Sequence, residues 1–216
     1  DTEADSLHAY PEKLCLIQLS HAGGDVLIDP LTSSSLAPLL DHLAGRTLIV
    51  HGGDFDLRLL RRCRGFVAAE IFDTAIAAQL LGQPRHGLRD LVAEFLGVQL
   101  HKGSQRADWS RRPLSAQMIA YAQNDTRYLS PLSEQLEAQL HERGRLAWHR
   151  EACARLVKTC ARASAPDPAR AWRIKGSSPL GPRALAALHE LWGWREAEAL
   201  RLDRPPYFVL SHELLL

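Results

Sequence analysis

The chain has 216 residues, of which 46% are hydrophobic and 24% charged, and its formal net charge is +1. This balance is typical of a globular protein and excludes a disordered tail, a collagen-like repeat and a disulfide-dense miniprotein. No apolar run approaches the roughly 20 residues that a membrane helix needs. With 26 basic against 25 acidic residues, a nucleic-acid partner would have to meet basic side chains gathered locally.

Cysteine usage and the start of the chain bear on its compartment. The cysteines are scattered and form no CxxC pair, which weighs against a zinc site and favours reduced, buried thiols. They are Cys15, Cys63, Cys153 and Cys160. The chain opens without a basic start or an apolar leader, so a signal peptide is not expected. We therefore predict a cytoplasmic protein, and the absence of an initial Met predicts that the sequence is a fragment.

The first third of the chain is predicted to form strands and short helices. Two apolar runs, 14–20 and 25–29, predict strands, and the glycine pair between them predicts a hairpin turn. Next come a helix, a strand and a helix, expected over 33–43, 47–50 and 54–62. Asp54 is suited to cap the last of these helices. The mixture predicts an α/β fold with a mixed β-sheet flanked by helices.

Helices dominate the rest of the chain. They are expected over 72–81, 87–96, 115–144, 146–163 and 182–202, with a last one beginning near Ser211. The stretch 101–113 is polar, basic and aperiodic. Residues 163–170 have the composition of a linker. A second, all-α unit is therefore predicted from about Trp172 onward, and it breaks off unfinished.

The long predicted helix carries an acid where an apolar residue belongs. Its apolar stripe runs from Met118 to Leu140 in steps of three and four residues, and Asp125 stands on it. A carboxylate on a buried face needs a hydrogen bond, an ion pair or a metal. Tyr121 lies one turn earlier and projects beside it. The alternative interpretation is an acid at the edge of the stripe, paired with Arg127.

Two further acidic groups lie near strands. Asp1 and Glu3 are two residues apart, so on a strand their carboxylates share one face and suit a divalent cation. The alternative is a solvated acidic terminus. In His51-Gly-Gly-Asp54-Phe-Asp56, a strand ends and a helix begins. Taken alone, Asp56 is explained by the helix dipole, Asp54 by capping, and His51 by a hydrogen bond at the strand end.

Together these segments form an ordered set of motifs. The set comprises Asp1-Thr-Glu3, His51-Gly-Gly-Asp-Phe-Asp56, Phe72-Asp-Thr74, Lys102-Gly-Ser-Gln-Arg-Ala-Asp108-Trp109, Arg112-Pro-Leu114 and Tyr121-Ala-Gln-Asn-Asp125. In this order the motifs resemble ribonuclease D and the wider DEDD superfamily of 3′→5′ exonucleases, in the subclass with tyrosine in its third motif. Residues 172–216 are similar to the start of the helicase-and-ribonuclease-D C-terminal module, a helical bundle tied to nucleic-acid binding.

The resemblance implies a fold and a division of the chain. The fold would be a ribonuclease H-like mixed β-sheet flanked by helices, followed by a partial all-α module. Residues 1–150 would form an exonuclease domain that is N-terminally truncated, because in the family residues precede the first motif. Residues 151–171 would form a connecting helix and linker, and 172–216 the partial C-terminal module.

The resemblance also implies a chemistry. Two divalent ions, Mg²⁺ or Mn²⁺, would be held by Asp1, Glu3, Asp56 and Asp125, and Tyr121 would orient or deprotonate the attacking water. The substrate would be the single-stranded 3′ end of an RNA, such as a tRNA precursor or another structured RNA, and the product a nucleoside 5′-monophosphate. Neither a membrane nor a protein partner is implied.

Other residues and functions stay open on sequence alone. The candidate nucleic-acid-binding residues are Lys102, Arg106, Arg112 and His51, although each basic residue of the loop also fits a solvated surface. Trp109 fits either base stacking or packing, and Asp73 is better explained as a helix cap than as a site residue. Two alternative functions remain, a DNA 3′→5′ exonuclease and a non-catalytic nucleic-acid-binding module.

Overall fold

The structure, a computed structural model, describes residues 1–33, 35–101, 103–162, 167 and 169–216. The chain forms two compact units. The N-terminal unit comprises Asp1–Glu3 and Leu14–Ala163, and the C-terminal unit comprises Ala4–Lys13 and Ser164–Leu216. The segment 4–13 thus groups with the C-terminal helices.

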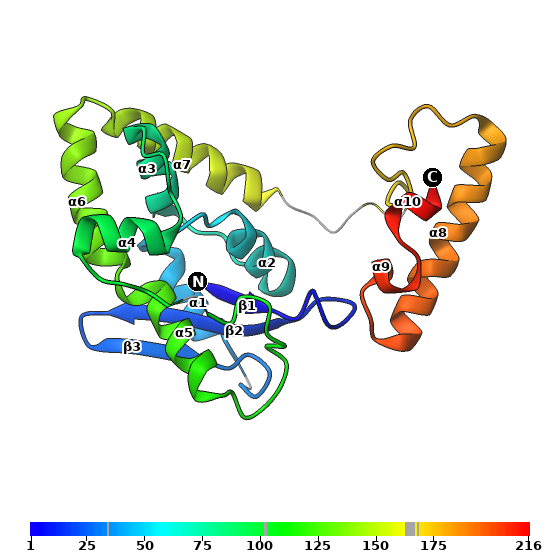
Figure 1. The fold of residues 1–216 in the computed structure, drawn as a ribbon, viewed down its shortest axis with the longest axis horizontal. Coiled ribbons are helices and arrows are strands. Elements are labelled where there is room, and N and C mark those ends of the chain that lie inside the picture. Colours follow the sequence, from blue (N-terminus) through cyan, green and yellow to red (C-terminus); the bar gives the residue numbers. More distant parts are fainter. Residues whose placement is uncertain (34, 102, 163–166, 168) are drawn as a thin grey trace. The chain divides into compact units, whose positions relative to one another are not determined.

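In the residues that the structure describes, the β-strands form two small sheets, and the strands of the first are labelled in Figure 1. The first contains β1 (Thr2–Ala4), β2 (Leu14–His21) and β3 (Gly24–Ile28), and β2 and β3 form the predicted antiparallel hairpin. The N-terminal residue joins this sheet, because the backbones of Asp1 and Gln18 exchange both hydrogen bonds, 3.0 and 3.1 Å long. The second sheet pairs β4 (Thr47–Val50) and β5 (Glu70–Asp73) in parallel.

Helices pack on these strands. They are α1 (Ala37–Ala44), α2 (Asp54–Arg64), α3 (Thr74–Leu81), α4 (Leu88–Leu96), α5 (Ala116–Arg127), α6 (Leu129–Glu142) and α7 (Leu146–Ala161). Helix α5 lies against β2 and β3, and α7 against β5, α2 and α3. Most predicted helices are confirmed, but α1 begins at Ala37 rather than at 33, because Pro38 favours the first turn of a helix.

The sequence predicts a single helix over 72–81, and this prediction is wrong for the first two residues. Phe72 and Asp73 end strand β5, and the helix begins at Thr74. The side chain of Asp73 accepts hydrogen bonds from the backbone N–H groups of Ala75 and Ile76. The predicted cap is therefore confirmed, and the cap itself separates strand from helix.

The long helix predicted over 115–144 is two helices, α5 and α6, which meet at Tyr128. The physical reason lies in Pro131, in the first turn of α6. Proline has no N–H to continue the hydrogen-bond ladder, and its ring clashes with the preceding turn. A proline is tolerated in a first turn, so a new helix begins here rather than an unbroken one.

The main core of the N-terminal unit is formed by helices. It joins alanine and leucine side chains of α3, Leu91 and Val92 of α4, and the stripe Leu132, Leu136 and Leu140 of α6. A second cluster contains Cys15, Leu16, Trp109 and Ala122, and Tyr121 packs against it. Trp109 is 1% exposed. It is therefore a packing residue and is not available for base stacking.

The C-terminal unit contains α8 (Pro182–Leu202), α9 (Pro206–Val209) and α10 (His212–Leu215). Helix α8 and the last helix were predicted, and the single-turn α9 was not. Within this unit Tyr10, from the segment 4–13, donates its backbone N–H to Asp203 and its hydroxyl to Glu196. Among the described residues, no helix is long and apolar enough to cross a membrane.

Candidate active site

Three of the predicted acids lie together. Asp1 and Glu3 come from the first strand and Asp125 from helix α5, and one carboxylate oxygen of each lies within 4.8 Å of the others. The strand places the first two acids on one face, as their spacing predicted. Helix α5 packs on β2, the neighbour of β1, and so carries Asp125 to the same place. Oxygen donors this close are the ligands that Mg²⁺ and Mn²⁺ prefer.

The fourth acid, Asp56, meets the first strand in a different way. Its Oδ1 accepts the backbone N–H of Thr2 at 2.9 Å and also the Thr2 hydroxyl. Asp56 lies in the first turn of α2 and is 9% exposed. It stands outside the group of three whose oxygens converge. The structure therefore brings Asp56 to the site through Thr2, with one oxygen already bound.

The acids raise one another's proton affinity. Burial, together with the charges of Asp125 and Asp56, raises the pKa of Glu3 to about 8. Burial likewise raises the pKa of Asp125 to about 7. Such carboxyl groups hold protons at neutral pH unless positive charge compensates them. The donor set therefore fits a divalent cation, which would let all the carboxylates ionise together.

Tyr121 lies one turn before Asp125, as predicted, and its hydroxyl forms hydrogen bonds with Asp125 and Gln105. Burial raises the pKa of the phenol, and the charge of Asp125 adds to this effect. The hydroxyl is thus protonated at neutral pH. The alternative partner of Asp125 is excluded, because Arg127 instead pairs with Asp25 at 2.5 Å.

Two glycines shape the turn before Asp56. The N–H groups of Gly52 and Gly53 each donate to the carboxylate of Asp73 at 3.0 Å. Asp73 is fully buried. Because its side chain also caps helix α3, it joins this turn to that helix. Asp54 is not the helix cap that the sequence predicted: Gly53 holds that position, and Asp54 pairs with Arg58.

His51 ends the strand before this turn, and its Nδ1 lies 2.9 Å from Thr74 Oγ1. This matches the interpretation of His51 as a hydrogen-bonded residue at a strand end. Burial lowers the pKa of its ring. A contact between His51 and nucleic acid stays a prediction.

Arg112 was predicted to bind nucleic acid, but the structure gives it a different role. Its guanidinium forms five hydrogen bonds, to both carboxylate oxygens of Asp29 and to the carbonyls of Cys15, Trp109 and Arg111. A guanidinium has five N–H donors, so none remains for a phosphate. Arg112 therefore anchors the loop to the sheet. Arg106 is exposed, and Lys102 lies outside the described residues.

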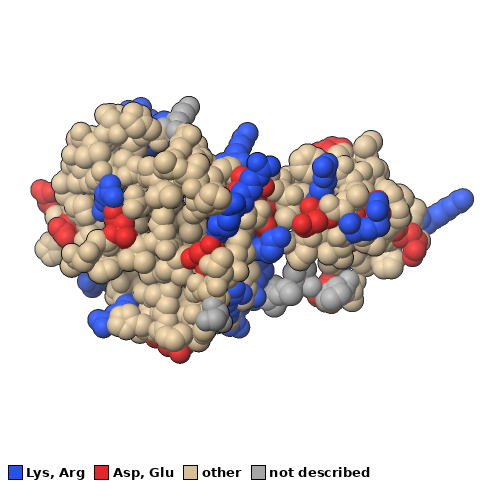
Figure 2. All heavy atoms as spheres, turned by 90° about the horizontal axis from the view of Figure 1, so that it is seen from below, with Lys and Arg blue, Asp and Glu red and all other residues tan. Residues whose placement is uncertain are grey.

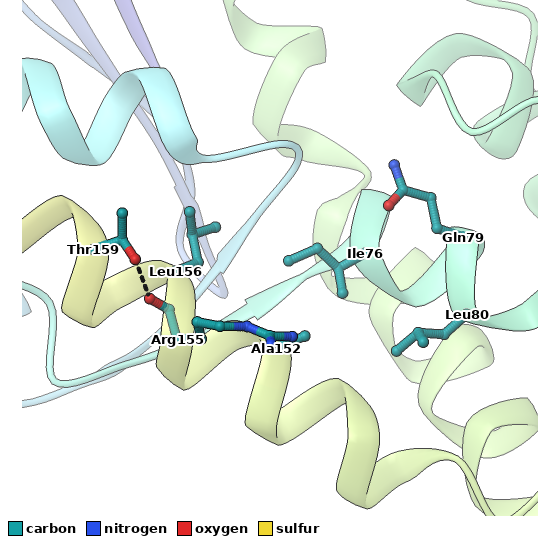
Figure 3. Close-up of a pocket in the computed structure, with 7 residues that line it drawn as sticks. All are labelled: Ile76, Gln79, Leu80, Ala152, Arg155, Leu156 and Thr159. Carbon is teal, nitrogen blue, oxygen red and sulfur yellow. Dashed lines mark hydrogen bonds between the residues drawn. The ribbon is translucent and has the colours of Figure 1, made fainter.

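A separate groove of about 450 Å³ lies between α3 and α7 (Figure 3). Its lining is mostly aliphatic, with Arg155 stretched along it. No catalytic candidate among the described residues lines this groove. The acid cluster is therefore the better candidate for the active site, and the groove is a feature of helix packing.

Sequence reasoning missed three supporting residues. Thr2 was treated only as the spacer of the first motif, Gln105 lay in an aperiodic loop, and Asp73 was explained fully by capping. Their partners are far away in the chain, so no local pattern reveals these contacts. The signal that the sequence did contain was that each of these residues stands inside one of the motifs.

Comparison with known proteins places the chain in a family. Residues 1–141 match the model of a 3′-5′ exonuclease domain, and residues 184–216 match the HRDC domain. The chain therefore belongs to the 3′-5′ exonuclease family. Among curated proteins it is 36% identical to ribonuclease D of Cronobacter turicensis over 100% of this chain, and 34% identical to that of Xanthomonas oryzae over 99%. It spans 59% and 60% of the lengths of these relatives.

Solved structures agree with this placement. Ribonuclease D of Escherichia coli, described as an exoribonuclease involved in structured RNA processing, matches with a TM-score of 0.82 and 32% identity over 100% of this chain and 58% of that one. The catalytic core of RRP6 from Trypanosoma brucei matches with a TM-score of 0.80 and 28% identity, over 100% and 62%. NrnC of Brucella melitensis with bound Mg²⁺ matches with a TM-score of 0.63 and 31% identity, over 74% and 81%. The fold is the ribonuclease H-like α/β fold that was predicted, followed by helices.

Proposed function

We propose that this chain is a metal-dependent 3′→5′ exoribonuclease that releases nucleoside 5′-monophosphates from the 3′ ends of structured RNAs such as tRNA precursors. The observation that carries the proposal is the convergence of Asp1, Glu3 and Asp125 within 4.8 Å, with the Tyr121 hydroxyl bonded to Asp125. Relatives named ribonuclease D and exosome complex component 10 support RNA as the substrate. The domain boundaries at 150 and 171 and the cytoplasmic location remain predictions.

The acids would hold two divalent cations, Mg²⁺ or Mn²⁺. Bound there, such ions lower the pKa of the attacking water and stabilise the leaving 3′ oxygen. Asp1, Glu3 and Asp125 would supply the converging oxygens, and Asp56 would complete the charge from its position beside Thr2. The match to a homologue with bound Mg²⁺ supports divalent ions at this fold.

Tyr121 would orient the water. Its protonated hydroxyl forms hydrogen bonds with the carboxylate of Asp125 and the side chain of Gln105. These two bonds would fix the direction in which the hydroxyl meets the attacking water. A fixed polar group beside the reacting phosphate contributes by orientation, which avoids the entropic cost of arranging the water during the reaction.

The RNA would be held by local positive charge. Figure 2 shows lysine and arginine side chains mixed with acidic ones over the visible surface, in keeping with a net charge of only +1, so the RNA would have to meet basic side chains placed locally. Arg106 and Lys102 are proposed to contact phosphates of the 3′ strand, with His51 beside the turn that carries Asp56. The helical module that matches HRDC would bind more distant parts of the RNA.

The experiment compares the unchanged chain with Asp125→Asn on a 5′-labelled single-stranded RNA and on DNA of the same sequence, with Mg²⁺ or Mn²⁺. We expect a ladder that shortens from the 3′ end of the RNA, and at least a 100-fold loss of rate in Asp125→Asn with little loss of RNA binding. Faster digestion of DNA would favour a DNA exonuclease. RNA binding without digestion would favour a non-catalytic module.

A further inference from the structure

Thr2 separates the two acids of the first strand but faces the other way. Side chains alternate along a strand, so the face that carries Asp1 and Glu3 is opposite to that of Thr2. Thr2 is 6% exposed, and both its N–H and its hydroxyl donate to the same oxygen, Oδ1 of Asp56. One residue thus joins the strand with two converging acids to the helix that carries the fourth.

Asp56 has a reason to need such a partner. Its carboxylate is bound to the residue that stands between Asp1 and Glu3, so its orientation decides how its charge meets theirs. A carboxylate oxygen that accepts two hydrogen bonds is held in one orientation and loses rotational freedom. With Oδ1 taken by Thr2, Oδ2 is the oxygen that would face a cation or its water ligand.

We propose that Thr2 is a positioning residue of this site, which fixes the orientation of Asp56 relative to Asp1 and Glu3 through its hydroxyl. The inference rests on the proposed function, because it assigns Thr2 a task in the same metal-dependent reaction. Partners that orient metal-binding carboxylates from behind commonly change metal affinity or activity by 10- to 100-fold when they are removed.

Two simple variants distinguish a positioning role of Thr2 from a role in packing alone. Thr2→Val keeps the β-branched shape and the backbone N–H, and it removes the hydroxyl. Thr2→Ser keeps the hydroxyl and removes a buried methyl group. If Thr2 acts through packing, the serine variant is the more damaged of the two, since removing a buried methyl leaves a cavity. If Thr2 positions Asp56, the valine variant is the more damaged.

The test measures kcat and KM on a short single-stranded RNA, together with the binding of Mn²⁺ alone by titration calorimetry. We expect kcat of Thr2→Val to fall about 10- to 100-fold with KM within twofold, and its Mn²⁺ affinity to fall about tenfold. Thr2→Ser should keep both kcat and Mn²⁺ affinity within about threefold. Thermal unfolding of both variants checks that they are folded.

The outcomes separate this inference from the proposed function. If the unchanged chain digests RNA and Thr2→Val matches it in kcat and in Mn²⁺ affinity, the inference is overturned and the function stands. If the unchanged chain binds Mn²⁺ without digesting RNA, the function fails, and the order of Mn²⁺ affinities still decides the role of Thr2. An unchanged chain that binds no Mn²⁺ overturns both.

Discussion

Arg112 lies in the basic segment 101–113, and its guanidinium is engaged within the protein. The guanidinium of Arg112 joins the loop to the hairpin through Asp29, at 2.6 Å, and through three backbone carbonyls. The hydrogen bond to Arg112 lowers the pKa of Asp29 to about 2. Composition alone cannot separate an anchoring arginine from a phosphate-binding one, because the difference lies in contacts that are distant along the chain.

The anchoring role of Arg112 predicts a loss of stability on replacement. Arg112→Lys keeps the charge but cannot reproduce the planar set of five donors, and we expect it to lower the free energy of unfolding by about 1–3 kcal/mol. The KM for RNA should stay within twofold at temperatures where the variant is folded. Arg111→Lys is the matched control, since Arg111 is exposed and pairs only at the surface with Asp108.

Denaturant unfolding and steady-state kinetics check this prediction together. If Arg112→Lys unfolds at the same denaturant concentration as the unchanged chain and its KM for RNA rises tenfold, the original interpretation of Arg112 as a phosphate contact is correct and the structural one is not.

At the scale of elements, Asp73 holds three pieces together. It ends β5, caps α3, and accepts the N–H groups of the glycine turn that leads to Asp56. Its Oδ1 accepts three of these four hydrogen bonds and its Oδ2 accepts the one from Gly53. Asp73 thus connects β5, helix α3 and the glycine turn of the second motif.

Asp73→Asn should therefore destabilise the fold. The amide can keep its oxygen toward the cap, but its NH₂ group then faces the N–H of Gly53, so a buried donor is left without an acceptor. We expect a loss of about 2 kcal/mol or more, measured by denaturant unfolding. In Asp54→Asn, which removes the charge of a surface pair on α2 but can keep an oxygen for the weak hydrogen bond from Cys160, the loss should be below about 0.5 kcal/mol. Equal losses of the free energy of unfolding in both variants would contradict a stabilising role of the buried Asp73 carboxylate.

Periodicity and turn chemistry predicted most elements because these signals are local. The hairpin, α4 and α8 follow directly from apolar spacing and glycine positions. The errors occur where a single residue divides a pattern, as Asp73 does after β5 and Pro131 does inside the long apolar stripe. For the site, spacing alone placed Asp1 and Glu3 on one face and Tyr121 beside Asp125. The convergence of Asp125 with Asp1 and Glu3, and the contact of Asp56 with Thr2, are tertiary contacts that spacing alone does not reveal.

For the whole molecule, the raised pKa values link stability to pH and to cations. A carboxyl whose pKa rises on folding favours the folded state below its unfolded pKa, near 4, and this contribution is lost as pH rises through the folded value. The folded values are about 8 for Glu3 and about 7 for Asp125. In EDTA, the melting temperature should therefore fall between pH 6 and pH 9.

Mg²⁺ should reverse this trend, because a cation binds the ionised carboxylates. The rise in melting temperature between EDTA and Mg²⁺ should be larger at pH 9 than at pH 6, with about 2–4 °C for each kcal/mol of stabilisation. Asp125→Asn, in which one repelling charge is absent, should melt above the unchanged chain in EDTA at pH 9 and should gain less from Mg²⁺. A Mg²⁺ effect that is independent of pH in both proteins would contradict the linkage.

The most direct test of the central claim is the identity of the first product. An RNA labelled at the phosphate before its last nucleotide would be digested with Mn²⁺ or in EDTA, and the products separated by thin-layer chromatography at early times. A metal-dependent 3′→5′ exonuclease releases the label as a nucleoside 5′-monophosphate before any shorter oligonucleotide accumulates, and only when the metal is present. Release of the label in internal fragments, as a 3′-phosphate or equally well in EDTA would contradict the assignment of the acid cluster as the active site.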